Sequence, residues 1–385
     1  MVTNNEQNKL NVPHLRFPEF HGEWEEHGLS EYLDFKNGLN PDSKRFGKGI
    51  KFISVMDILN NPVITYDCIR ASVQATDAEM SSFSVENGDI LFQRSSETLE
   101  DVGRANVYID DKVAVFGGFV IRGKKKANYN PLFFRYLLSS PYARKRIIPM
   151  GAGAQHFNIG QEGLSKVLLN FPSIEEQTKI ASLLHLLDER IATQSKLIEK
   201  LESLIKGLRV SLMQIENGNI VHLDEIARIY QPQTISSTEL TEEGFLVYGA
   251  NGIIGKYKQY NHKTEQICIT CRGNTCGMVN YTKPMSWITG NAMVINTDEH
   301  QNKVCKRYLY HYLSAYNFNS IISGSGQPQI VRTPLEQLKV PLPTFLEQKQ
   351  KATFLDKIQG KIEINNKTLN LYLQQKQYLL RQMFI

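Results

Sequence analysis

One long amphipathic pattern occurs twice in this sequence, and the two copies lie 171 residues apart. Residues 173–217 and 344–385 both carry apolar side chains at alternating steps of four and three residues. This heptad period, sustained over about four repeats, is typical of helices that pack along their length. The sequence therefore predicts two helices of roughly 40 residues, each about 60 Å long, that can pack on each other within one chain.

The apolar seam of each predicted helix contains a polar residue near its midpoint. Gln194 and Asn365 occupy equivalent seam positions, either as tolerated polar residues or as a device that fixes the register of the pair. Lys351 and Lys376 interrupt the second seam, which indicates either uneven packing or positions that a partner covers. The predicted seam residues are Leu184, Leu187, Ile191, Gln194, Ile198 and Leu201 in the first helix, and Leu355, Ile358, Ile362, Asn365 and Leu369 in the second.

Both long helices have the same predicted start. A proline is followed by Ser173-x-x-Glu176 in the first copy and by Thr344-x-x-Glu347 in the second. In such a capping box, a hydroxyl and a carboxylate bond to backbone N–H groups that have no partner inside the helix. We therefore expect a reciprocal capping box at both starts.

The duplication extends into the segments that precede each helix. Residues 87–98 resemble residues 264–275, and this alignment places Arg94 opposite Arg272. Short β-rich runs punctuated by Gly, Asn and Asp predict a mixed domain in each copy, with one helix near residues 131–146 of the first. The expected architecture is α+β, with mixed α/β domains at 1–172 and 218–343 and long helices at 173–217 and 344–385.

The sequence contains no convincing catalytic, nucleotide-binding or metal-binding constellation. Cys268-x2-Cys271 resembles half of a zinc site, but the alignment places Ile90 and Gln93 at these positions of the first copy, where no thiolate is present. We therefore expect a protein that is not itself an enzyme and has no metal or cofactor of its own. The five cysteines fit a reducing compartment, and no apolar run reaches about 18 residues, so we expect a cytoplasmic protein.

Two arginines and two glycine-rich loops are the candidate nucleic-acid contacts. Arg94 and Arg272 each follow an apolar strand and enter a polar loop, where an arginine can bond guanine or phosphate, or form an ordinary strand-end ion pair. Loop amides can hydrogen-bond base edges or remain solvated. The net charge of +5 supports DNA binding only weakly, because residues 344–385 alone hold 7 basic and 3 acidic side chains. The candidate DNA-binding residues are Arg94, Ser95, Ser96, Lys44, Lys48, Gln155, His156, Asn158, Asn251, Arg272, Asn274, Gln327 and Gln329.

Taken together, these features resemble the specificity subunit of type I restriction–modification enzymes. The resemblance covers nearly the whole chain and rests on the duplicated order of domain and helix. It also rests on the runs VPHLRFPEFHGEW, NGDILFQR and YGANGIIG and on the two helix starts. It implies two target-recognition domains, each reading one half of a split site on double-stranded DNA, and an antiparallel coiled coil that sets the gap between the halves.

The resemblance further implies partner subunits and no membrane. Two modification subunits, which hold S-adenosylmethionine and methylate adenine, would dock on the helical scaffold. Two restriction subunits would add translocation and cleavage that depend on ATP and Mg. Two other classes stay open at this point, namely a stand-alone DNA-binding protein and a coiled-coil scaffold that binds only protein.

Overall fold

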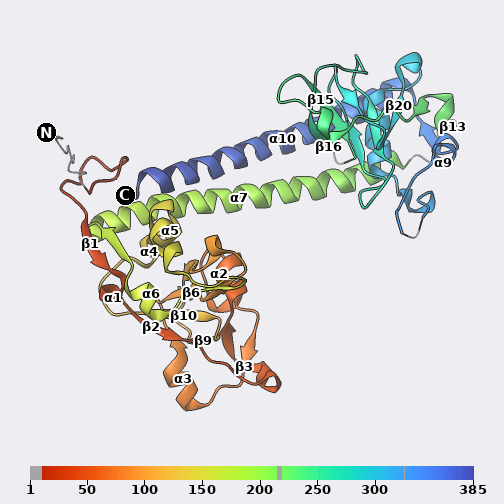
Figure 1. Ribbon diagram of the computed structural model, residues 1–385. Helices are drawn as coiled ribbons and strands as arrows, with labels where there is room; N and C mark the ends of the chain where they lie inside the picture. Colours follow the sequence, from red (N-terminus) through yellow and green to blue (C-terminus); the bar gives the residue numbers. More distant parts are fainter. Residues whose placement is uncertain (1–10, 215–218, 251, 325) are drawn as a thin grey trace. The chain divides into compact units, whose positions relative to one another are not determined.

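The computed structural model describes residues 11–214, 219–250, 252–324 and 326–385 (Figure 1). The chain divides into two compact units, of which unit 1 comprises Met1–Ser195 and Thr368–Ile385, and unit 2 comprises Lys196–Lys367. The two long helices are α7 (Ile174–Met213) and α10 (Phe345–Gln382). Each unit therefore holds one mixed domain together with a part of both long helices.

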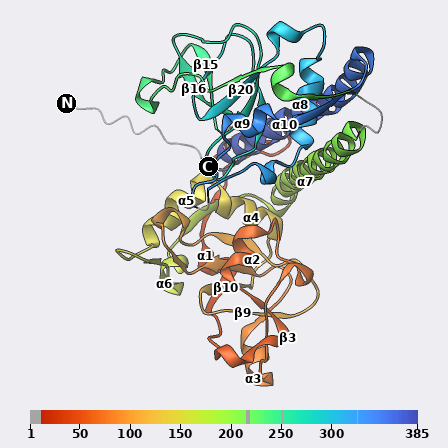
Figure 2. The same cartoon turned by 90° about the vertical axis from the view of Figure 1, so that its right-hand side faces the viewer.

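The domain of unit 1 is built on two four-stranded sheets. The first is antiparallel with the order β2-β10-β6-β8, and the second has the order β4-β3-β9-β5 with β3 and β9 parallel. Helices α4 and α5 lie at one end of this domain, and β3 and α3 lie at the other (Figure 2). The strands are β1 (Glu25–Gly28), β2 (Leu33–Asn37), β3 (Phe46–Ile53), β4 (Ser72–Val73), β5 (Ser84–Val85), β6 (Ile90–Gln93), β7 (Ser95–Ser96), β8 (Ala105–Val107), β9 (Ala114–Phe116), β10 (Val120–Lys125), β11 (Phe157–Asn158) and β12 (Leu168–Phe171). The short helices are α1 (Leu29–Tyr32), α2 (Val55–Asn60), α3 (Asp77–Phe83), α4 (Pro131–Ser139), α5 (Pro141–Ile147) and α6 (Gln161–Ser165).

The single helix predicted near residues 131–146 is wrong in one respect, because the segment forms two helices. Pro141 has no N–H to continue the ladder of α4, and the Ser140 hydroxyl accepts a hydrogen bond of 3.2 Å from the Ala143 N–H as the N-cap of α5. Both helices still bury apolar side chains, including Phe133 and Ile147.

Unit 2 repeats the plan of unit 1. Its antiparallel sheet has the order β14-β20-β17-β18, which matches β2-β10-β6-β8, and its β15 and β19 are parallel as β3 and β9 are. The duplication predicted from the sequence is therefore present in the fold. The strands are β13 (Asn219–His222), β14 (Arg228–Tyr230), β15 (Phe245–Gly249), β16 (Gly252–Tyr257), β17 (Ile267–Thr270), β18 (Val279–Tyr281), β19 (Trp287–Ile288), β20 (Ala292–Asn296) and β21 (Lys339–Leu342), and the short helices are α8 (Lys306–Ala315) and α9 (Arg332–Glu336).

The long helices run antiparallel within each unit, as the resemblance implied. In unit 1, Leu184 near the start of α7 shares a core with Leu379 near the end of α10. In unit 2, Ile205 of α7 shares a core with Leu355 and Ile362 of α10. All eleven predicted seam residues are buried or half-buried, which is what a helix–helix interface requires.

The two lysines that interrupt the seam have partners inside their own units. Lys376 Nζ bonds Asp188 Oδ1 of α7 at 2.5 Å in unit 1. Lys351 Nζ donates to the Leu212 carbonyl at 2.7 Å in unit 2. That carbonyl belongs to the last turn of α7, where oxygens lack helical partners and a cation is favoured. No covering partner is needed to account for either lysine.

The two helix starts differ more than their sequences suggest. Thr344 and Glu347 form the expected reciprocal box, with bonds of 2.9 Å from the Thr344 N–H and 3.4 Å from the Glu347 N–H. At the first start only the Glu176 N–H to Ser173 hydroxyl bond is present, at 3.4 Å. The Glu176 carboxylate instead accepts two bonds from Arg16, of 2.8 and 2.7 Å. The reciprocal box predicted at Ser173 is therefore wrong, because a buried bidentate ion pair takes the carboxylate.

A buried polar cluster joins the domain of unit 2 to its long helices. His311 of α8 donates from Nε2 to Asp356 Oδ1 at 2.8 Å, and its Nδ1 accepts from Arg209 Nε at 3.2 Å. Asp356 also accepts from Arg307 Nε at 2.8 Å. Burial lowers the pKa of His311 below 6.5, and the hydrogen bond to Asp356 opposes this only in part. The folded protein therefore holds His311 neutral near pH 7.

Because His311 is neutral in the folded protein, we predict that the stability of unit 2 depends on pH. Below about pH 6.5 the unfolded chain binds a proton at His311 more readily than the folded chain, so the free energy of unfolding should fall as the pH is lowered. His311→Gln replaces the ring N–H donor with an amide N–H donor and removes the titration. Calorimetric melting between pH 7.5 and 5.5 should show a smaller loss of stability in the variant than in the wild type. Equal losses would contradict the assignment.

Candidate nucleic-acid interface

In unit 1 the structure brings the two predicted contact segments together. Strand β7 pairs with β11, so that Ser95 lies opposite Asn158, and their side chains are hydrogen-bonded. The Ile159 N–H also donates to the Arg94 carbonyl at 2.9 Å. Together with the exposed Gln155 and His156, these segments form one surface, which we call surface 1 (residues 94–96 and 155–158).

Unit 2 has the equivalent surface, which we call surface 2 (residues 272–274 and 327–329). Arg272 and Gln329 form a β-bridge, and the Gly273 N–H donates to the Pro328 carbonyl at 3.0 Å. Arg272, Asn274, Gln327 and Gln329 are all exposed. Arg272 and Gln329 line a cavity of about 370 Å³ together with Tyr230, Gln231 and Arg332. The predicted amides and arginine therefore converge in space.

The backbone pairing corrects the alignment of Arg94 with Arg272. The Ile159 N–H to Arg94 O bond corresponds to the Ile330 N–H to Cys271 O bond, which is 3.0 Å long. Gln93 pairs with Val120, just as Thr270 pairs with Ala292. Arg94 is thus equivalent to Cys271, and Ser95 is equivalent to Arg272.

The one-residue shift separates the roles of the two arginines, because successive side chains of an extended chain point in opposite directions. Arg94 is half-buried and donates from Nη1 to the Gly118 carbonyl at 3.3 Å. Its counterpart Cys271 is buried, and its sulfur accepts from Gln231 Nε2 at 3.1 Å. Arg272 is exposed, so it is the better placed of the two for an external ligand.

The corrected alignment also changes which residues of unit 1 are equivalent to the cysteines of unit 2. Cys268 now matches Leu91 rather than Ile90, and Cys271 matches Arg94 rather than Gln93. Burial raises the pKa of the Cys268 thiol. Among the residues that the structure describes, no group of three or more His, Cys, Asp and Glu side chains could hold a metal ion.

The remaining predicted contacts are less closely grouped. Lys44 and Lys48 are exposed on either side of Phe46, which lines a cavity that also reaches Ser95. Arg45 between them is engaged by Glu79, at 3.0 Å from Nη1 to Oε1. Asn251 lies outside the described residues.

Reasoning from polar residues missed the exposed apolar side chains beside surface 1. Phe119 and Met56 are exposed by 69% and 60%, and both line the cavity beside Ser95. The signal in the sequence is the run Gly117-Gly118-Phe119, a tight turn that carries an aromatic side chain between two apolar strands.

No helix in the described ranges carries enough apolar residues to span a bilayer.

Both copies of the duplicated architecture match a known protein family. The model of one family, described as "Type I restriction modification DNA specificity domain", matches residues 21–203 and again residues 216–373. The MjaVIII specificity subunit of a type I restriction enzyme from Methanocaldococcus jannaschii is 22% identical over 413 aligned residues, which cover 94% of this chain and 91% of that one. The EcoprrI specificity subunit from Escherichia coli is 32% identical over 140 residues, or 35% of this chain and 34% of that subunit.

Solved structures resemble the same architecture. The type I restriction–modification S subunit from M. genitalium superposes with a TM-score of 0.66 at 17% identity, covering 97% of this chain and 99% of that one. A chain from a study of the assembly and conformational transition of the type I system has a TM-score of 0.54 at 16% identity, covering 93% and 96%. At these identities the likeness concerns the fold.

Proposed function

Because this chain belongs to the family of type I restriction modification DNA specificity domains, we propose that it reads a split, asymmetric DNA site for a type I complex. Each domain would contact one half of the site through its surface 1 or surface 2. The observation that carries the proposal is that two copies of one backbone plan present different side chains at equivalent positions. Ser95 stands where unit 2 has Arg272, and Asn158 stands where it has Gln329. Two such readers should recognise different half-sites.

The long helices would supply the distance between the half-sites and the docking surface for partners. A rigid helix pair can act as a ruler, since protein geometry fixes half-site spacing. Both long helices carry exposed apolar side chains that a docked subunit could cover, and a contiguous apolar patch would mark such an interface. They include Leu186, Leu371 and Tyr378 in unit 1 and Leu197, Leu204, Leu346 and Phe354 in unit 2.

The proposal assigns no catalytic step to this chain. Two modification subunits would bind S-adenosylmethionine and methylate adenine. Two restriction subunits would use ATP and Mg for translocation and cleavage. Their docking on the helical scaffold would place this chemistry beside the DNA that the two domains select.

Exchange of one domain tests the proposal. Cells that express this chain with its modification subunits should methylate one bipartite motif, which methylome sequencing identifies. Replacing residues 1–170 with those of a related specificity subunit should change one half of that motif and leave the other half intact. A motif that changed in both halves would contradict independent reading by the two domains.

Arg272 gives a residue-level prediction. Arg272→Ala should leave the melting temperature of the protein unchanged, because the side chain is exposed. If Arg272 makes a bidentate contact with guanine, affinity for the methylated motif should fall by about 1–3 kcal/mol, while affinity for random duplex changes little. Equal losses on both duplexes with a shallower salt dependence would indicate a phosphate contact. Arg94→Ala is the matched comparison and should have a smaller effect, since Arg94 already bonds the Gly118 carbonyl. Unchanged affinity in Arg272→Ala would remove this residue from the interface.

A further inference from the structure

Phe119 is the most exposed of the large apolar side chains in the described residues, at 69%. It lies in the turn between β9 and β10, which the Val120 N–H closes by donating to the Gly117 carbonyl at 2.9 Å. Burying a phenyl ring is favourable, so a ring exposed to water at the tip of a packed turn indicates a possible contact site.

The turn itself is common to both units. In unit 2 the Ala292 N–H donates to the Thr289 carbonyl at 3.0 Å, which makes Asn291 the equivalent of Phe119. The second residue of the turn is glycine in both copies. A Cβ there would overlap Asn40 Oδ1 at Gly118 or Thr234 Oγ1 at Gly290. The backbone is thus fixed by packing, whereas the exposed side chain that follows it differs between the units.

Phe119 lies directly beside surface 1. Its carbonyl accepts from the Arg94 N–H at 2.9 Å, and the neighbouring Gly118 carbonyl accepts from the Arg94 guanidinium. The ring borders a cavity of about 430 Å³ that Ser95, Phe46 and Met56 also line. No acidic side chain is among the described residues that line this cavity.

The charges at the margin of this apolar site favour DNA as its occupant. Lys44 and Lys48 are exposed and flank Phe46 in the sequence, Arg94 adjoins the turn, and these cations outnumber the exposed Asp42 next to Pro41. Cations at the rim can meet phosphates, which position a protein on the duplex without reading sequence. The base edges in the major groove present one apolar group, the 5-methyl group of thymine, and apolar side chains recognise it by contact.

We propose that Phe119 is a specificity-determining residue whose ring contacts the 5-methyl group of a thymine in the half-site read by unit 1. This inference rests on the proposed function and adds a chemical prediction to it. The half-site of unit 1 contains a thymine on one strand that is recognised through its methyl group. Unit 2, with Asn291 at the same place, lacks this contact.

The test uses the complex of the full chain with its modification subunits and the motif identified by methylome sequencing. Each thymine of the motif is replaced in turn by uracil, which removes only the methyl group, and binding is measured by fluorescence anisotropy. In the wild type, uracil at one position of the unit 1 half-site should weaken binding about fourfold, the effect expected for one buried methyl group. In Phe119→Ala the thymine and uracil duplexes should bind equally.

Two comparisons make the result specific. Asn291→Ala, at the equivalent turn of unit 2, should keep the full uracil response, and melting curves of both variants should match the wild type because both side chains are exposed. The absence of any uracil response across the unit 1 half-site in the wild type would overturn the inference, as would a uracil response that persists in Phe119→Ala. An equal loss for thymine and uracil duplexes in that variant would indicate a ring wedged between base pairs instead, and would also overturn it. Failure of the wild-type complex to bind its methylated motif would refute the proposed function itself.

Discussion

Adding one heptad to each long helix is expected to lengthen the spacer of the methylated site by about three base pairs. Seven residues inserted after Gln194 and seven after Asn365 keep the seam in phase and add about 10 Å of helix at 1.5 Å per residue. B-DNA rises about 3.4 Å per base pair, so the same displacement corresponds to three pairs. Methylome sequencing should show both half-sites unchanged around a longer gap.

The insertion needs a control that separates length from damage. A heptad inserted in α7 alone leaves its residues without partners on α10, so this variant should lose methylation or melt at a lower temperature. If the double insertion folds and methylates with the original spacer, something other than the long helices determines the distance between half-sites.

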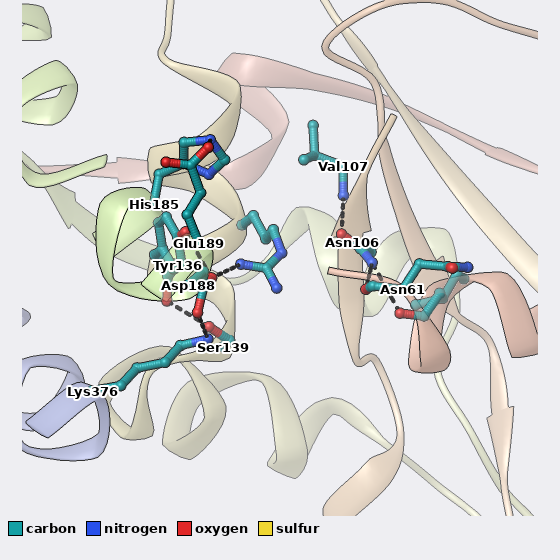
Figure 3. A network of polar contacts seen from close by, with 11 residues as sticks. Asn61, Asn106, Val107, Tyr136, Ser139, His185, Asp188, Glu189 and Lys376 are labelled. Carbon is teal, nitrogen blue, oxygen red and sulfur yellow. Dashed lines mark hydrogen bonds and ion pairs between the residues drawn. The ribbon is translucent and has the colours of Figure 1, made fainter. Parts of the chain in front are cut away.

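Removal of the Asp188 carboxylate is expected to destabilise unit 1 by about 3 kcal/mol. This side chain of α7 is 16% exposed and lies among three donors (Figure 3). The Tyr136 hydroxyl donates to it at 2.9 Å, Arg135 at 3.3 Å, and Lys376 of α10 at 2.5 Å. Asp188→Ala leaves two cations and a phenol partly buried without this partner. Removing one partner of a buried ion pair strongly lowers the free energy of unfolding.

The neighbouring residue provides a matched control for this experiment. Glu189 is 60% exposed, and its ion pair with His185 is 3.7 Å long at the surface. Glu189→Ala should therefore change stability by about 0.5 kcal/mol or less. Differential scanning calorimetry should show the unit 1 transition lowered by roughly 10 °C in Asp188→Ala and nearly unmoved in Glu189→Ala. Equal shifts in the two variants would show that the cluster around Asp188 does not stabilise the unit.

Periodic features of the fold could be predicted from the sequence. The heptad pattern predicted both long helices, which the structure places at Ile174–Met213 and Phe345–Gln382. The alternation of short apolar runs and turns predicted a duplicated mixed domain, and the two antiparallel sheets have the same strand order. These properties depend on the spacing of residues a few positions apart, so the sequence pattern predicts them without the tertiary structure.

The sequence predicted residues of both surfaces, but it did not predict correctly which residues of the two units are equivalent. The sequence indicated Arg94 and the loop at residues 155–158 as separate candidate DNA contacts, and the β7–β11 pair brings them together. It failed at the pairing of Arg94 with Arg272, because matching the two arginines by identity hides a shift of one residue. Backbone hydrogen bonds decide equivalence, and a shift of one residue turns a side chain to the other side of the strand. Phe119 escaped notice because an apolar residue between two strands is ordinarily buried.

The sequence by itself determined which segments become helices and strands, where the duplication lies, and that two loops in each domain carry polar side chains. Only the tertiary structure decided which charges meet. Arg16 takes the Glu176 carboxylate that local rules assign to a capping box, and Lys376 reaches Asp188 across the helix pair. The residues of each pair lie 160 and 188 positions apart. Secondary structure reflects the spacing of near neighbours, whereas an ion pair forms wherever packing brings two side chains within hydrogen-bonding distance, and no local pattern encodes that distance.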